Sequence, residues 1–183
     1  MPRLFTGLEI PAEVVGRLSA FSGGLPGARW IDEDDLHITL RFFGDVDIDT
    51  ANAVHALLEE ARPRALLPIE LDGLAIFGGA KPRAVYVSVA SNPELADLQA
   101  EHERIARHAG LDPEPRKFTP HVTLARLNRS TGPEAVAHYL GQAGVFSRVS
   151  FTAERTALFS ARASRGGGPY VVETVYPFVP GQK

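Results

Sequence analysis

The 183-residue sequence contains no cysteine, one methionine and one tryptophan. The absence of cysteine excludes disulfides, thiolate nucleophiles and cysteine-ligated zinc. No apolar run approaches the roughly 20 residues that a membrane-spanning helix needs. The start, MPRLFTGLEIP, also lacks the basic segment and long apolar segment of a secretory signal. We therefore expect a cytoplasmic protein without membrane contact.

Neither sign of charge dominates the chain. Its 19 Lys and Arg residues and 22 Asp and Glu residues give a net charge of −3. This balance argues against a basic protein that coats nucleic acid without specificity, although it leaves room for a locally basic site. The hydrophobic share of 44% suffices to bury a core. We expect residues 1–183 to form one domain.

Hydrophobic periodicity and Gly/Pro punctuation predict alternating strands and helices in an order that repeats. The expected strands are residues 3–10, 36–46, 65–77, 83–90, 118–127, 148–161 and 169–179, and the expected helices are residues 11–22, 49–61, 92–110 and 132–143. Each half of the order runs strand, helix, His-Thr strand, short helix, strand, which indicates an internal duplication. We predict an α+β fold of two pseudo-symmetric lobes, with two antiparallel sheets, helices packed outside and a central cleft between the lobes.

A His-x-Thr triplet occurs in both halves, as LHITL at residues 36–40 and HVTL at residues 121–124. Because strand side chains alternate, each His shares a face with the Thr two residues later, while the apolar residues anchor the other face. A single strand histidine is more often structural than functional, and composition alone predicts about 0.3 such triplets. Two triplets at equivalent places in a repeated order indicate a joint function.

Two imidazoles and two hydroxyls around a two-fold axis suit the cleavage of a phosphodiester. Near pH 7 one imidazole can accept a proton from water while the other donates a proton to the leaving oxygen. The hydroxyls can donate hydrogen bonds to the non-bridging phosphate oxygens, where charge is held in the transition state. Such proton transfers require neither a metal nor a cofactor.

The segments HITL and HVTL resemble the paired H-x-T-x signature of the two-histidine phosphoesterase superfamily. More narrowly, RLFTGLEIP, RW…LHITLRFFGDV and FTPHVTLAR are similar to bacterial and archaeal RNA 2′,3′-cyclic phosphodiesterases, also called 2′-5′ RNA ligases. The similarity extends from the first strand to the hairpin ALFSAR…GGPYVVE and so covers nearly the whole chain.

This resemblance implies a bilobal fold and hydrolysis of a terminal RNA 2′,3′-cyclic phosphate to a 2′-phosphate, without metal or cofactor. It assigns His37 as the proton donor to the 3′-oxygen and His121 as the proton acceptor that activates water. Thr39 and Thr123 would hold the phosphate oxygens. The near symmetry means that residue chemistry alone does not choose between the two histidine roles.

We expect a monomer that acts on RNA with a 2′,3′-cyclic phosphate end, such as tRNA fragments or oligoribonucleotides. The resemblance also implies the reverse joining of a cyclic end to a 5′-hydroxyl, without ATP. No Gly-rich loop of the nucleotide-binding type is found in the sequence, in agreement with ATP independence.

An arginine follows each motif, and the two arginines are expected on different faces. The family carries an arginine at the position of Arg126, which implies a phosphate contact. Strict alternation nevertheless places Arg126 on the face opposite His121, so that a strand end or bulge is needed to bring it into the site. The same alternation places Arg41 on the face of His37.

Aromatic and basic residues flank the motifs. Phe42, Phe118 and Trp30 are candidates for stacking on the terminal base, although aromatic residues beside strands more often belong to a core. A basic rim for the RNA backbone would use Arg116, Lys117, Arg129, Arg162 and Arg165. The four other histidines are expected at the surface: His55, His102, His108 and His138. The acidic run at residues 32–35 is expected to form a solvated loop.

Three other functions remain open on these residues. The first is another enzyme of the same superfamily, acting on a cyclic nucleotide or an ADP-ribose cyclic phosphate. The second is a non-catalytic module that binds RNA ends, although intact His and Thr in both motifs argue against it. The third is a two-histidine metal site, which lacks an obvious third ligand.

Overall fold

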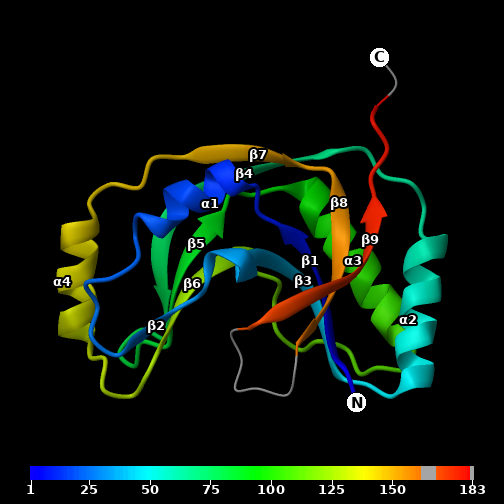
Figure 1. Cartoon of the computed structure of the whole chain (residues 1–183), viewed down its shortest axis with the longest axis horizontal. Helices are drawn as coiled ribbons and strands as arrows, with labels where there is room; N and C mark the ends of the chain where they lie inside the picture. Colours follow the sequence, from blue (N-terminus) through cyan, green and yellow to red (C-terminus); the bar gives the residue numbers. More distant parts are fainter. Residues whose placement is uncertain (162–167, 182–183) are drawn as a thin grey trace.

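The computed structural model describes residues 1–161 and 168–181 (Figure 1). Its strands are β1 (Arg3–Glu9), β2 (Ala28–Trp30), β3 (His37–Asp45), β4 (Leu67–Phe77), β5 (Ala84–Val89), β6 (His121–Leu127), β7 (Val149–Ala153), β8 (Arg155–Ala161) and β9 (Tyr170–Pro177). Its helices are α1 (Ala12–Ser19), α2 (Ile48–Glu60), α3 (Pro93–His108) and α4 (Pro133–Ala143), with a short 3-10 turn at Glu33–Asp35. The fold is α+β, as predicted.

The strands form one nine-stranded sheet in the order β7-β4-β5-β6-β3-β1-β8-β9, with β2 paired to β6. All the named strand pairs are antiparallel. The prediction of two sheets was therefore wrong. The physical reason is that the two motif strands, β3 and β6, pair with each other in the middle of the order and join what would otherwise be a five-stranded and a four-stranded sheet.

The junction between β3 and β6 is a single residue pair, Ile38 opposite Val122. Each of these residues is the middle one of its His-x-Thr triplet, and both have an exposed fraction of 0%. The sheet therefore joins its halves at the two motifs.

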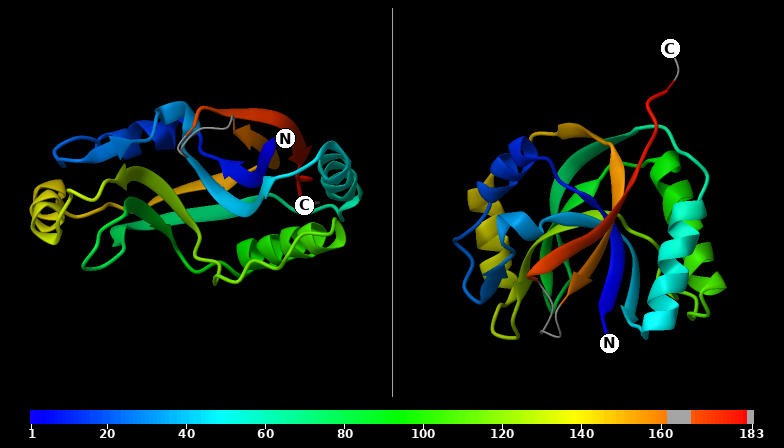
Figure 2. Two further views of the ribbon diagram at one scale, coloured as in Figure 1. Left: turned by 90° about the horizontal axis from the view of Figure 1, so that it is seen from below. Right: turned by 45° about the vertical axis from the view of Figure 1, so that its right-hand side comes forward.

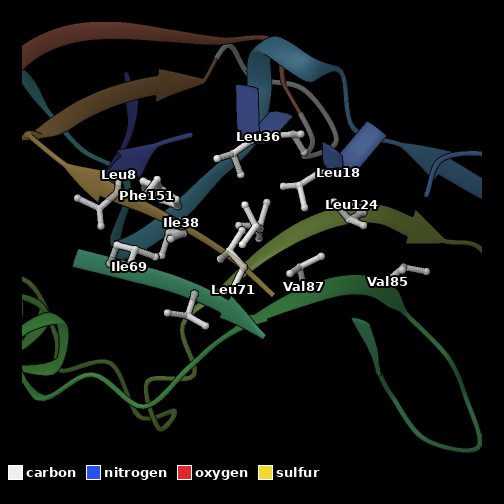
Figure 3. Packing of buried hydrophobic residues seen from close by; sticks show 14 of the residues in the cluster. Leu8, Leu18, Leu36, Ile38, Ile69, Leu71, Val85, Val87, Leu124 and Phe151 are labelled. Carbon is white, nitrogen blue, oxygen red and sulfur yellow. The ribbon is translucent and has the colours of Figure 1, made fainter. Parts of the chain in front are cut away.

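The main core also crosses this junction. It contains Leu8 and Ile38 from one half of the sheet together with Ile69, Val87 and Leu124 from the other (Figure 3). Fully burying an aliphatic side chain of this kind contributes roughly 1.5–3 kcal/mol to stability. The two halves therefore share one hydrophobic interior.

The helices cover the sheet at two ends, with α1 and α4 towards one end and α2 and α3 towards the other (Figures 1 and 2). Both longer helices begin at a side-chain cap. The Asp47 carboxylate accepts the backbone N–H of Thr50 at 2.7 Å and starts α2, and the Asn92 side chain accepts the N–H of Leu95 at 3.0 Å before Pro93 of α3. No helix in the described ranges is both long enough and apolar enough to cross a membrane.

Two features of the sheet differ from the predicted strands. The three-residue strand β2 was not predicted, because it is too short to show an alternation. The predicted strand at residues 148–161 is divided at Glu154 into β7 and β8, which lie near opposite ends of the sheet. Apolar alternation reports burial, and it carries no information on which neighbour a strand pairs with.

Candidate active site

The four motif side chains lie on the same face of the sheet. Residues directly opposite each other in an antiparallel pair point to the same side, so Ile38 and Val122 both enter the core. The residues on either side of them then point to the other face, which brings His37 and Thr39 beside His121 and Thr123. The electrostatic effect of His121 on the pKa of His37 agrees with this proximity.

Each imidazole is held by a backbone carbonyl through the same ring nitrogen, Nδ1. The Nδ1–H of His37 donates to the carbonyl oxygen of Asp35 at 2.7 Å, and the Nδ1–H of His121 donates to that of Thr119 at 2.7 Å. A carbonyl can only accept, so Nδ1 carries the proton and Nε2 is left for chemistry. The Nε2 of His37 lies 2.9 Å from the Thr39 hydroxyl. Both histidines therefore present the reactive nitrogen to the same face.

The site disfavours the charged form of both imidazoles in the free protein. Burial lowers the pKa of His37 to about 4, against the hydrogen bond to Asp35, with smaller lowering effects from His121 and Arg126. Burial also lowers the pKa of His121, and Arg126 lowers it further. An anion bound beside the rings would oppose both effects, since it favours the charged imidazolium.

A β-bulge places Arg126 on the site face. In β6, Thr123 lies opposite Tyr86 and Ala125 lies opposite Val85, so Leu124 is an extra residue in the register. The bulge shifts the alternation by one residue and returns Arg126 to the face of His121. The influence of Arg126 on the pKa of both histidines agrees with this position.

The same bulge occurs in β3 and has the opposite effect on Arg41. Thr39 lies opposite Gly7 and Arg41 lies opposite Thr6, so Leu40 is the extra residue. Arg41 turns away from His37, is only 6% exposed, and donates from its Nη2 to the carbonyl of Asp112 at 2.7 Å. The expectation that Arg41 shares the face of His37 was therefore wrong.

Phe42 takes the place on the site face that Arg41 was expected to occupy. It is 44% exposed. Phe42 follows His37 by five residues, as Arg126 follows His121, and each comes directly after the bulged segment of its strand. Equivalent positions in the two motif strands thus carry an aromatic ring and a guanidinium.

Aromatic rings that were not predicted surround both histidines. The His37 ring centroid lies 4.8 Å from that of Phe5, 5.5 Å from Phe159 and 5.1 Å from Tyr170. The His121 ring lies 4.9 Å from Phe77 and 5.5 Å from Tyr86. These rings provide the burial that lowers the histidine pKa values. They come from strands whose places in the sheet could not be known from the sequence.

The remaining stacking candidates pack into the interior. Trp30 contacts the main core and lies 5.7 Å, between ring centroids, from Tyr139, on the face opposite the histidines. It therefore does not occupy a stacking position. Phe118 is half-buried and packs against the same core, and its contact with a base stays a prediction.

Three of the five residues of the predicted basic rim are among the described residues. Arg116 forms an ion pair with Glu114 at 2.8 Å, and Lys117 and Arg129 are exposed. Arg162 and Arg165 lie outside the described residues.

Two residues expected at the surface are buried. His102 is 3% exposed, its Nδ1 lies 2.7 Å from the Thr6 hydroxyl, and burial lowers its pKa to about 3. Asp35, the last residue of the acidic run, is 7% exposed, and its carboxylate accepts the backbone N–H of Tyr170 at 3.0 Å. Asp35 thus ties the carbonyl that holds His37 to strand β9.

Within residues 1–161 and 168–181, no three His, Asp or Glu side chains are grouped as metal ligands would be.

A pair of His-x-Thr motifs that share one face of an antiparallel sheet is typical of a two-histidine phosphoesterase. The chain belongs to the 2′-5′ RNA ligase superfamily, whose sequence model matches residues 11–165.

Two relatives agree with this family. The chain is 35% identical over 138 residues to a protein of Aeropyrum pernix named RNA 2′,3′-cyclic phosphodiesterase, covering 72% of this chain and 77% of that protein. It is 30% identical over 164 residues to a Bacillus subtilis protein of the same name, covering 86% and 87%.

Among solved structures, TT0787 of Thermus thermophilus superimposes with a TM-score of 0.80 at 21% identity, covering 98% of this chain and 100% of that one. Escherichia coli LigT complexed with 3′-AMP superimposes with a TM-score of 0.77 at 21% identity, covering 97% and 99%. At this identity the likeness establishes the fold.

Proposed function

We propose that this protein hydrolyses the terminal 2′,3′-cyclic phosphate of RNA to a 2′-phosphate. The observation that carries the proposal is the presence of two imidazoles on one sheet face, each with Nδ1 held by a carbonyl and Nε2 presented to that face. The names of the Aeropyrum and Bacillus relatives support the substrate class.

The reaction places the phosphorus atom between the two Nε2 atoms. His121 takes a proton from water, and the water oxygen attacks the phosphorus. The bond from phosphorus to the 3′-oxygen breaks, and that oxygen takes the Nε2 proton of His37. Thr39 and Thr123 donate hydrogen bonds to the non-bridging oxygens as charge builds on them. The imidazoles then exchange protons with solvent, and one 2′-phosphate and one free 3′-hydroxyl are produced.

The proton donor becomes charged only when substrate is bound. A pKa of about 4 leaves His37 neutral near pH 7 in the free protein, and the phosphodiester anion beside the ring favours its protonation. The assignment of His37 as donor and His121 as acceptor rests on the family resemblance. A substrate with sulfur in place of the 3′-oxygen separates the roles, because a thiolate leaves without an acid. It should rescue a variant that lacks the donor and leave a variant that lacks the acceptor inactive.

The residues after the two bulges orient the substrate. Phe42 offers an exposed ring on which the terminal base can stack, and Arg126 offers a guanidinium to the phosphate. An aromatic ring in one half and a cation in the other favour one orientation of the RNA end over its reverse. Phe118 is a second candidate for contact with the base.

We also propose that residues 1–183 form one monomeric domain that arose by duplication, with a cleft between its halves. The strand order supports the duplication, because β6-β5-β4-β7 mirrors β3-β1-β8-β9 around the junction. The recurrence of the bulge after each motif supports it further. Light scattering of the purified protein tests the monomer, and a dimer mass would contradict it.

Product analysis on an oligoribonucleotide that ends in a 2′,3′-cyclic phosphate tests the reaction. We expect a 2′-phosphate end and undiminished turnover in EDTA. A 3′-phosphate product would refute the bond assignment, and binding without turnover would favour a non-catalytic module. Faster hydrolysis of ADP-ribose cyclic phosphate would favour another superfamily member. Loss of activity in EDTA would favour a metal site. Addition of a 5′-hydroxyl oligonucleotide without ATP tests the reverse ligation.

A further inference from the structure

A second arginine faces the site directly beside Arg126. In the pair of β2 with β6, Arg29 lies opposite Arg126 and Trp30 lies opposite Ala125. Ala125 and Trp30 both pack into the core. Because neighbouring residues in a strand alternate, Arg29 and Arg126 point to the opposite face, which is the face of the histidines. Both arginines are exposed.

Close packing and hydrogen bonds on both sides of strand β2 fix the position of Arg29. Just before the strand, Gly27 adopts a φ of 80°, and an added Cβ would collide with the Thr131 hydroxyl and lie 2.7 Å from the Asn128 side-chain oxygen. Thr131 is itself 4% exposed and donates its hydroxyl hydrogen bond to the carbonyl of Pro26 at 2.8 Å. Past the strand, the N–H of Ile31 donates to the carbonyl of Leu124 at 2.8 Å.

Guanidinium forks match the oxygens of phosphate, and two of them placed opposite each other on paired strands are suited to bind one anion together. Strand β2 pairs with β6 beyond the place where β3 leaves it. The arginine pair is thus three residues past Thr123, or about 10 Å along the strand. This distance leaves room for a second phosphate beside the one that reacts.

We propose that Arg29, together with Arg126, binds a second phosphate of the substrate, the one on the 5′ side of the terminal nucleotide. Arg126, whose charge affects the pKa of both histidines, contacts both phosphates, whereas Arg29 contacts only the second. The protein therefore prefers a nucleotide that carries a 5′-phosphate group over a bare nucleoside cyclic phosphate. This inference rests on the proposed hydrolysis of cyclic phosphate ends.

Three substrates with the same base test the second phosphate. They are a nucleoside 2′,3′-cyclic phosphate, its 5′-phosphorylated form, and a dinucleotide that ends in the cyclic phosphate. We expect kcat/KM to be about tenfold or more higher for the two substrates with a second phosphate, mainly through KM, as a charge-assisted hydrogen bond supplies. A gain with the dinucleotide alone would assign the site to a phosphodiester of an RNA chain, and a gain with both would assign it to any 5′-phosphate group.

The variant Arg29→Ala should bring the ratio of kcat/KM between the dinucleotide and the nucleoside substrate towards one. For the dinucleotide, the slope of log kcat/KM against log salt should become shallower by about 0.7, the value for one lost phosphate contact to a single strand. Arg29→Lys keeps the charge and should keep part of the ratio. Arg107→Ala, an exposed arginine near the end of α3, is the matched control and should keep the wild-type ratio and slope.

Two results separate the failure of this proposal from that of the function. If none of the three substrates is hydrolysed, the proposed reaction is refuted, and the second phosphate site with it. If all three are hydrolysed at equal kcat/KM, or if Arg29→Ala keeps the wild-type ratio, only the role of Arg29 is refuted.

Discussion

We expect kcat/KM of this protein to begin falling, on the alkaline side of its pH profile, at an unusually low pH. In the proposed mechanism, the active form has one protonated and one neutral imidazole. In the free protein, burial holds the pKa of His37 at about 4 and lowers the pKa of His121 below its ordinary value near 6.5. A lowered pKa means that a ring loses its proton at a lower pH. The singly protonated form therefore dominates only below pH 6.5.

The size of the effect follows from the titration. Because kcat/KM reports the free enzyme, it should fall tenfold per pH unit above the higher of the two pKa values. At pH 7.5 it should be at least about tenfold below its maximum. The kcat profile reports the bound state, where the phosphate anion raises both pKa values, and its alkaline limb should lie at higher pH.

The assay measures kcat and kcat/KM from pH 4 to 9 at constant ionic strength, with a dinucleotide that ends in a cyclic phosphate. The variant Arg126→Gln removes a positive charge that lowers the pKa of both histidines. Its kcat/KM limb should move to higher pH while KM rises. Arg107→Gln is the matched control and should leave the limb in place. A wild-type limb at pH 7.5 or above would refute the reasoning from burial, and an unmoved limb in Arg126→Gln would refute the electrostatic role of that residue.

Three further predictions concern single residues. His37→Ala and His121→Ala should each lower kcat by about 10²–10⁴-fold with the fold intact, and the double variant should be little worse, because the two act as a unit; robust activity in either single variant would contradict the mechanism. His102 has a folded pKa of about 3, so its contribution to stability is present above pH 6.5 and is lost as the pH falls. Urea unfolding should show about 2 kcal/mol lost from this group between pH 8 and pH 5, a loss that is missing in His102→Gln; equal losses in both proteins would oppose the assignment. Gly7→Ala would place a Cβ 2.6 Å from the carbonyl oxygen of Ile38, and it should lower both the melting temperature and kcat. An unchanged melting curve would show that the backbone at Gly7 can relax.

The pairing of the motifs could be predicted from the sequence, but their surroundings could not. Alternation places His37 with Thr39 and His121 with Thr123, whatever the neighbouring strands are. Beyond each Thr a bulge shifts the alternation, and nothing in the letters LHITLRFF or HVTLAR marks the extra residue. The sequence therefore predicted the wrong face for Arg41. For Arg126 it predicted the site face only if a bulge was present, and the structure shows that bulge.

Other features were missed for different reasons. The position of His102 carried a usable signal, because Leu95, Leu98, His102 and Ile105 recur at helical spacing and are all buried in the structure. Phe5 and Phe159 beside His37 carried none, since their approach depends on β1 pairing with both β3 and β8. Long-range pairing of this kind is decided by the packing of the whole sheet.

Because a single residue pair joins β3 to β6 beside both histidines, any unfolding that breaks this junction also takes the active site apart. A molecule in which one half has melted, or has exchanged partners with a neighbouring chain, loses the contact of Ile38 with Val122 and separates the two imidazoles in the same event. We therefore expect intermediates on the unfolding pathway to be inactive and proteolytic fragments of either half to have no partial activity. Residual turnover during denaturation thus counts intact molecules.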